Sequence, residues 1–289
     1  SRQRYCMDGF INILKPQGPT ASDMVVRLRG ILKQKKIGHL GTLDPGACGV
    51  LPIAVGKGTK LFDFLVFKRK KYRAFFTFGK TTDTLDSFGV LVEEKDFVFD
   101  KDAMKNALKS LEGVQMQIPP AYSALSVNGV RAYTLARKGV SPDLPPRRVE
   151  IYSLDLVRQV EEKVFCIDIE CSGGTYVRSI CRDVAQKLGT VGYMSGLIRI
   201  ASGKFSTENA CTLKEVEENP ESCVLPLTEP LNEFPETIVE DRFYKDLSNG
   251  VKIPTNMSEI DLCRVYCKGE FWGLGRNENG FLKLVYYLR

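Results

Sequence analysis

GHLGTLDPGACGVLP, residues 38–52, is the most informative part of this 289-residue sequence. Four of the twelve residues at 38–49 are glycines, which let the backbone bend tightly and let another molecule approach it closely. Pro45 disfavours the helical conformation at Asp44 and holds that residue in an extended or turn geometry. The apolar run at 50–55 predicts a buried strand. Asp44 is therefore presented on a tight loop before a strand, five residues after His39, the chain's one histidine.

In an isolated Asp-Pro-Gly the aspartate most often only hydrogen-bonds its own turn. A functional role for this loop is therefore judged together with the other motifs of the sequence. Four other motifs accompany it in a fixed order: GFINILKPQGPTAS at 9–22, KYR at 71–73, TTDTLD at 81–86 and GTYVRS at 174–179. With these motifs in register, the chain resembles bacterial tRNA pseudouridine synthases of the TruB family, which isomerise uridine 55 in the tRNA T loop. The resemblance runs from about residue 9 to about residue 203 and continues more weakly to the C-terminus.

The spacing of apolar residues predicts an α+β protein, because strands and helices are interleaved without a βαβ rhythm. We expect strands at 10–14, 50–55, 72–78 and 164–171, and helices at 20–32, 59–65, 100–111 and 176–188. The resemblance implies the pseudouridine synthase fold over residues 7–232, with a mixed, largely antiparallel central sheet flanked by helices and loops. Short strands after residue 220, two of them joined by an Asn-Gly turn, predict a small β-rich module over 233–289. The family usually carries a PUA-type RNA-binding domain there.

A segment between two proline pairs, at about 119–147, is rich in basic and aromatic residues. Such a segment supplies both phosphate contacts and stacking faces for RNA, and Arg131, Arg137 and Lys138 are the candidate contacts. It resembles the thumb-like insertion that family members press against the tRNA arm. The alternative is a helical hairpin carrying ordinary surface arginines.

Composition narrows the classes of function. The apolar fraction of 43% and charged fraction of 26% are those of an ordinary globular protein, and the net charge of +6 permits a polyanionic partner without requiring one. Neither a membrane-spanning run nor a signal peptide is visible, and the nine cysteines lack the pattern of a secreted disulfide framework. We therefore expect a cytoplasmic protein with reduced thiols and no metal site. Walker-A and dinucleotide-binding glycine motifs are also missing from the sequence.

The expected reaction breaks the N1–C1′ bond of uridine, rotates the base and forms a C5–C1′ bond. It involves neither redox change nor group transfer, so no cofactor is expected. The resemblance assigns the reacting carboxylate to Asp44. It assigns to Tyr72 a ring beneath the everted base that also moves a proton, and to Arg178 the cation that keeps Asp44 ionised. Attack at base C6 and action at the sugar remain equally open.

The remaining site residues also follow from the resemblance. His39 matches the histidine that enters the RNA loop where the target base has left. Tyr176 and Leu197 match positions that contact the substrate base. Lys15 and Pro16 match a motif that supports the active-site wall. Without the resemblance, each of these would be an ordinary surface or core residue.

One position departs from the family pattern: Ile198 stands where members often have a first arginine, ahead of Arg199. The departure puts one backbone or RNA contact in doubt, but not the chemistry. Three functions remain open: a stand-alone tRNA pseudouridine synthase acting as a monomer without protein partners, the catalytic subunit of an RNA-guided particle, and a non-catalytic tRNA-binding or tRNA-folding protein. We favour the first, because the second usually has longer extensions at both ends and the third does not need Asp44, Tyr72 and Arg178.

Overall fold

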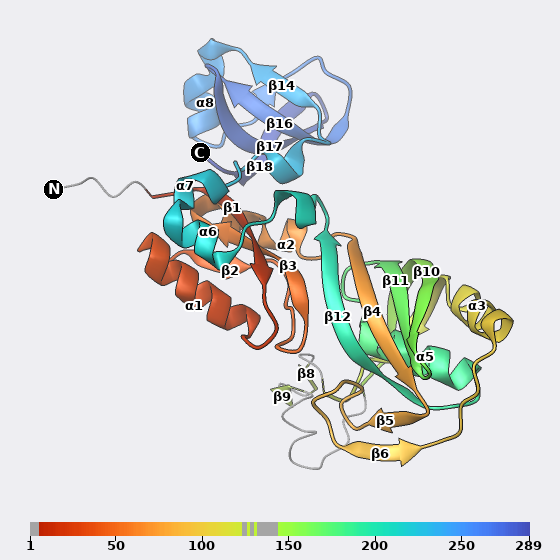
Figure 1. Ribbon diagram of the computed structural model, residues 1–289. Coiled ribbons are helices and arrows are strands. Elements are labelled where there is room, and N and C mark those ends of the chain that lie inside the picture. Colours follow the sequence, from red (N-terminus) through yellow and green to blue (C-terminus); the bar gives the residue numbers. More distant parts are fainter. Residues whose placement is uncertain (1–5, 123–125, 128–129, 132–143) are drawn as a thin grey trace.

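The computed structural model describes residues 6–122, 126–127, 130–131 and 144–289, and it confirms the α+β fold class (Figure 1). A nine-stranded mixed sheet has the order β1-β3-β12-β4-β11-β10-β7, with β2 paired to β3 and β13 to β12. Its strands are β1 (Gly9–Lys15), β2 (Ile37–His39), β3 (Cys48–Val55), β4 (Lys70–Phe78), β7 (Gly113–Gln117), β10 (Arg147–Glu161), β11 (Val164–Cys171), β12 (Gly192–Ser202) and β13 (Phe205–Ser206). A separate hairpin consists of β5 (Lys80–Thr82) and β6 (Leu91–Glu94).

Helices flank this sheet, and none of the described ones is both long enough and apolar enough to cross a membrane. The α-helices are α1 (Ala21–Leu32), α2 (Phe62–Leu65), α3 (Lys101–Ser110), α5 (Val177–Lys187), α6 (Leu213–Glu218), α7 (Pro220–Cys223) and α8 (Tyr244–Ser248). Short 3-10 helices lie at Gly56–Leu61, Thr207–Asn209, Glu229–Leu231 and Asp241–Phe243. Helix α1 begins as its sequence predicts: Thr20 and Asp23 form a capping box, and Met24, Val25 and Leu28 are buried.

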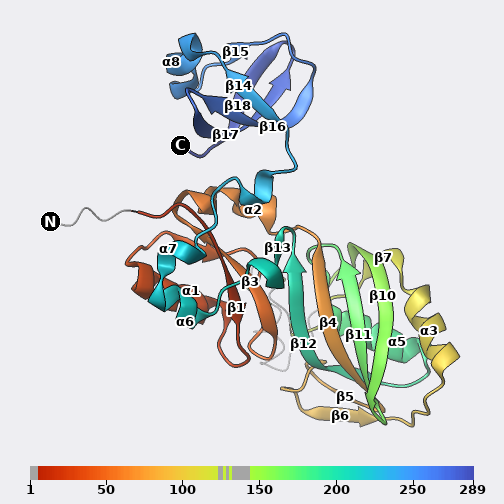
Figure 2. The same ribbon diagram turned by 45° about the horizontal axis from the view of Figure 1, so that its top comes forward.

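The large sheet has two halves that meet at a narrow seam. Strands β3 and β12 pair in parallel through only two residue pairs, Ile198 with Cys48 and Arg199 with Gly49. On one side, α1 packs with β1 and β3 around one apolar core. On the other side, α3 and α5 pack against β4, β10 and β11 around a second core. The two halves lie side by side in both views (Figures 1 and 2). The loop carrying Asp44 runs directly into β3, so it lies at this seam.

The insertion expected at 119–147 connects β7 to β10, which are neighbouring antiparallel strands. The described part of it contains a two-stranded ladder of β8 (Ser126–Val127) and β9 (Val130–Arg131). Arg131 therefore lies in β9, whereas Arg137 and Lys138 lie outside the described residues. The sheet itself continues without a break on either side of the insertion.

The C-terminal residues form a sheet of their own, of order β14-β16-β17-β18-β15. Its strands are β14 (Glu236–Val239), β15 (Ile253–Pro254), β16 (Ile260–Cys267), β17 (Glu270–Glu278) and β18 (Phe281–Tyr287). The fully buried Trp272 lies in its core. Asn279 and Gly280 take positive φ values of 54° and 76° in the turn between β17 and β18, as the Asn-Gly pair predicts. The expected β-rich region is therefore confirmed, while its assignment as a PUA domain stays a prediction.

Candidate active site

The loop that carries Asp44 is anchored on both sides of that residue. The side chains of Leu43 and Ala47 are buried in the core beside α1, with 3% and 2% of their surfaces exposed. The Asp44 carbonyl accepts a hydrogen bond of 3.0 Å from the Ala47 amide, which closes the turn. Between these anchors the Asp44 side chain remains 53% exposed. The sequence thus forces a carboxylate outward from a fixed backbone.

Arg199 of β12 holds this loop through hydrogen bonds to its backbone. Arg199 is 2% exposed, and its guanidinium donates three hydrogen bonds to backbone carbonyls: 2.7 Å to Val50, 3.1 Å to Thr42 and 3.1 Å to Gly41. Gly49 sits directly against the Arg199 backbone, where an added Cβ would collide with the carbonyl oxygen. This close approach, together with its φ of 110°, explains why glycine is needed there. Arg199 is a positioning residue for which the sequence predicted no role.

Lys15 and Pro16 support the same loop from the other side. The Lys15 ammonium is buried and donates to the carbonyls of Pro16 at 2.9 Å and Pro19 at 2.7 Å. Burial lowers the pKa of Lys15, and electrostatic interactions with Cys48 and Asp44 partly oppose that shift. The turn that Lys15 closes then donates from the Gly18 amide to the Pro45 carbonyl at 2.8 Å. The role that the resemblance implies for Lys15 and Pro16, support of the active-site wall, stays a prediction.

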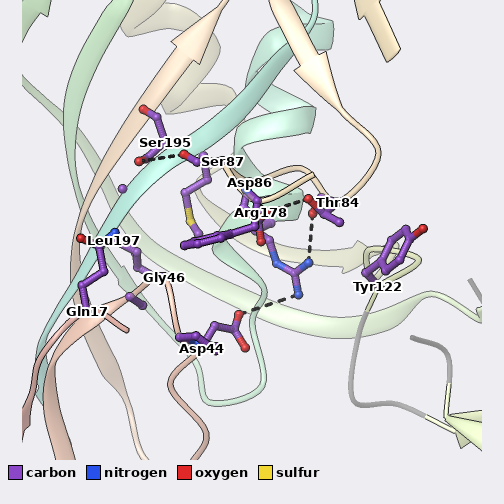
Figure 3. Close-up of a pocket in the computed structure, with 15 residues that line it drawn as sticks. Gln17, Asp44, Gly46, Thr84, Asp86, Ser87, Tyr122, Arg178, Ser195 and Leu197 are labelled. Carbon is purple, nitrogen blue, oxygen red and sulfur yellow. Dashed lines mark hydrogen bonds and ion pairs between the residues drawn. The ribbon is translucent and has the colours of Figure 1, made fainter. Parts of the chain in front are cut away.

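Asp44 faces a pocket of about 360 Å³ that opens between the two halves of the sheet (Figure 3). Its lining residues come from the turn after β1, the loop that carries Asp44, the turn after β5, the insertion, α5 and β12. They are Gln17, Asp44, Pro45, Gly46, Ala47, Thr84, Asp86, Ser87, Phe88, Tyr122, Arg178, Met194, Ser195, Gly196 and Leu197. The mixture of apolar walls with a few charged groups is typical of a small-molecule or base-sized site.

Arg178 brings a positive charge to Asp44 from the opposite half of the sheet. It lies in the first turn of α5, and its side chain is 9% exposed. One guanidinium nitrogen lies 3.9 Å from the Asp44 carboxylate, while another donates to the Thr84 carbonyl at 3.0 Å (Figure 3). The second contact fixes the guanidinium beside the Asp44 carboxylate.

Tyr72 lies on β4. In the sheet it is the cross-strand neighbour of Arg199, and it is half-buried. Burial raises the pKa of its phenol, although the Arg199 cation acts in the opposite direction. The phenol is therefore protonated at neutral pH. Tyr72 does not appear among the residues that line the pocket.

His39 and Tyr176 also lie outside the pocket lining, whereas Leu197 is part of it. His39 ends β2, and among the described residues its buried Nδ1 finds no hydrogen-bond partner. Burial, helped by the Arg199 charge, lowers the pKa of His39, so the ring is neutral at pH 7. Tyr176 precedes α5 and is held through its backbone by the Gln117 side chain, at 2.9 and 3.1 Å.

Sequence reasoning assigned no role to the turn that follows β5. Asp86 accepts hydrogen bonds from the Thr84 hydroxyl at 2.6 Å and from the Phe88 amide at 3.0 Å. Thr84, Asp86 and Phe88 all line the pocket. The alternation of Thr and Asp at 81–86 was the available signal, because such side chains close tight turns.

The described residues include one group with metal-ligand geometry, Cys211, Glu215 and Cys223, whose candidate ligand atoms lie within 4.8 Å of one another. It belongs to the segment around α6 and α7 and is not part of the pocket. The nine cysteines are free thiols.

Family models and individual relatives place this chain in the same protein family. The description "TruB family pseudouridylate synthase (N terminal domain)" matches residues 29–177, and "tRNA pseudouridylate synthase B C-terminal domain" matches residues 178–232. The tRNA pseudouridine synthase B of Alkaliphilus oremlandii is 41% identical over 295 residues, covering 98% of both chains. That of Clostridium kluyveri is 39% identical over 286 residues, covering 96% of this chain and 99% of the relative.

Solved structures agree on the fold. A chain of an H/ACA RNP bound to a substrate RNA containing 2′-deoxyuridine superposes with a TM-score of 0.73 at 21% identity, covering 97% of this chain and 85% of that one. A chain of an archaeal box H/ACA sRNP Nop10–Cbf5 complex gives 0.71 at 20% identity, covering 99% and 87%. At such identities the likeness concerns the fold alone.

Fold and sequence together define the class of protein as a pseudouridylate synthase, an isomerase, as the resemblance implied. Within that class, the chain belongs to the TruB family.

Proposed function

We propose that this protein isomerises uridine to pseudouridine in tRNA, at position 55 of the T loop, with Asp44 as the reacting carboxylate. The observation that carries the proposal is the half-exposed Asp44 side chain at a pocket whose other wall supplies Arg178 at 3.9 Å. The choice of tRNA rests on the relatives, which are named tRNA pseudouridine synthase B.

The pocket suits a base that has left its stack. Turning a nucleotide out of a folded RNA costs a few kcal/mol, part of which is recovered by contacts in the pocket. Leu197 and the buried Met194 offer apolar walls for the uracil ring. A carboxylate beside the base can add to it or to the sugar, or stabilise positive charge as the N1–C1′ bond breaks. Arg178 orients the Asp44 carboxylate for this step. We assign the movement of a proton during rearrangement to the phenol of Tyr72, which lies on β4 outside the pocket lining.

RNA binding outside the pocket is assigned to two regions. The insertion at about 119–147 supplies Arg131, Arg137 and Lys138 to the phosphates of the T stem. The module at 233–289 acts as a PUA-like RNA-binding domain beside the catalytic domain at 7–232. The separate sheet and core of that module support this division.

The alternative functions differ in what they need. A subunit of an RNA-guided particle would act only with a guide RNA and partner proteins, and the solved structures with a similar fold come from H/ACA particles. The much higher identity to the tRNA pseudouridine synthase B relatives favours a stand-alone enzyme. We further propose a monomer that works in the cytoplasm without a protein partner, cofactor or metal ion.

The decisive experiment measures tritium release from tRNA labelled at uridine C5, with purified protein and neither guide RNA nor nucleotide. We expect turnover by the wild type and none by Asp44→Asn. The affinity of that variant for tRNA should stay within about tenfold, or about 1.4 kcal/mol. Asp102→Asn, at an exposed position in α3, is the matched control and should remain active.

An active Asp44→Asn variant would contradict the assignment of that residue. A wild type that requires a guide RNA would favour the RNA-guided alternative. A wild type that binds tRNA but releases no tritium would favour the non-catalytic one.

A further inference from the structure

An exposed aromatic ring stands at the mouth of the active-site pocket. Phe88 lines the pocket, yet 69% of its surface is exposed. Its ring lies directly on Gly46, two residues after Asp44, so closely that an added Cβ at Gly46 would collide with it. By contrast, Ala47 and Met194 on the inner wall are 2% and 7% exposed. The Phe88 ring therefore forms the rim of the pocket and leaves much of its surface in water.

The turn that carries Phe88 is held by its own hydrogen bonds and not by burial of the ring. The Asp86 carboxylate accepts from the Phe88 amide at 3.0 Å, and the Asp86 carbonyl accepts from the Thr82 hydroxyl at 2.6 Å. The Ser87 hydroxyl donates to the Ser195 carbonyl of β12 at 3.2 Å. These contacts fix the position of Phe88 on the free protein. Since the turn does not need the ring for its stability, the ring is available to a ligand.

We propose that Phe88 is a stacking platform for a nucleobase that adjoins the target uridine, a role that rests on the proposed function. When the target base leaves its stack, each neighbouring base loses a stacking partner. The aromatic face of Phe88, which lies against Gly46, replaces that partner. Stacking on a ring accepts any base, because every base has a π face, so Phe88 contributes affinity and register without demanding a sequence.

The test couples a protein change to an RNA change. Phe88→Ala and wild type are compared on a T stem-loop and on two versions of it, each with an abasic site on one side of the target uridine. We expect Phe88→Ala to raise KM about tenfold on the intact loop, with kcat within about twofold. On one of the abasic loops, the wild type and Phe88→Ala should have the same KM. Phe88→Trp, which keeps an aromatic ring, should bind the intact loop as the wild type does.

Phe67→Ala is the matched control, because Phe67 is 66% exposed and does not line the pocket. Any effect of Phe67→Ala should be the same on all three RNAs. An effect of Phe88→Ala that persists undiminished on both abasic loops would overturn the proposal, as would an unchanged KM on the intact loop. Dissociation constants for the same RNAs give the same comparison without turnover. Loss of wild-type turnover would therefore count against the proposed function, and loss of the coupling against this inference.

Discussion

Replacement of Arg199 by methionine should separate the positioning of Asp44 from its chemistry. The change keeps an unbranched apolar stem but removes three hydrogen bonds, to the carbonyls of Gly41, Thr42 and Val50. Bonds from a charged donor contribute about 1.5–3 kcal/mol each, and bonds sharing one side chain do not add fully, so we expect a loss of about 3–5 kcal/mol in the free energy of unfolding.

The catalytic effect should exceed what the loss of stability explains. Two of the three carbonyls lie two and three residues before Asp44, so the carboxylate loses its fixed position. A displacement near 1 Å can cost about 10²-fold in rate, and we expect kcat of Arg199→Met to fall by about that factor at temperatures where the protein stays folded. Single-turnover tritium release measures the rate, and urea unfolding measures the stability.

Arg264→Met provides the matched control. Arg264 also donates to a backbone carbonyl, that of Phe234 at 2.8 Å, and it pairs with Glu236 at 3.2 Å in the C-terminal module. This variant should lose stability but keep its kcat. If folded Arg199→Met turns over as fast as Arg264→Met, the loop does not depend on Arg199 and the reasoning is wrong.

Three other perturbations test separate features. Burial lowers the pKa of Lys70 to about 7 from 10.5, so the unfolded chain binds more protons than the folded one between these values and stability rises with pH. We compare the unfolding free energies of the wild type and of Lys70→Met by urea titration at several pH values. Between pH 7 and pH 9, the difference between them should grow in favour of the wild type by up to about 1.4 kcal/mol per pH unit. A difference that does not change with pH would contradict a buried neutral amine at Lys70. Arg178→Lys should lower kcat about 10–100-fold with little change in KM, whereas an effect on KM alone would remove the guanidinium from the reaction step. Replacing Arg131 and Arg137 together with alanine should reduce the slope of log K against log salt by about 2, and an unchanged slope would make the insertion ordinary surface.

The sequence predicted the elements whose apolar pattern is regular. The strands expected at 10–14, 50–55, 72–78 and 164–171 correspond to β1, β3, β4 and β11, and the long helices correspond to α1, α3 and α5. It did not predict β10 and β12, the two longest strands of the sheet. Both contain irregular register, in β12 between Met194 and Gly196 and between Arg199 and Ala201. Each bulge shifts the inward-facing positions by one residue, so the alternation that identifies a strand is lost.

The candidate site divides in the same way. A local motif sufficed to select Asp44, since glycine and proline act on the backbone next to them. The roles of Arg199 and Phe88 depend on contacts with residues distant in the chain, such as the bond from Arg199 to Val50. No spacing rule connects such residues: the register of β3 beside β12 brings Arg199 to the loop, and the turn between β5 and β6 brings Phe88 to Gly46. The absence of Tyr72 and Tyr176 from the pocket lining was equally invisible to a linear pattern.

The narrow seam between β3 and β12 makes catalysis depend on how firmly the two halves of the sheet are held together. Asp44 and Arg178 belong to halves of the sheet with different apolar cores, joined by two residue pairs of β3 and β12 and by the hydrogen bonds of Arg199. Either half can keep its own core while the seam loosens. The Asp44 carboxylate would then lose its contact with Arg178 although most of the protein remained folded. As the denaturant concentration rises, activity should therefore disappear before the protein unfolds globally. Turnover then reports whether the two halves remain correctly placed at the seam.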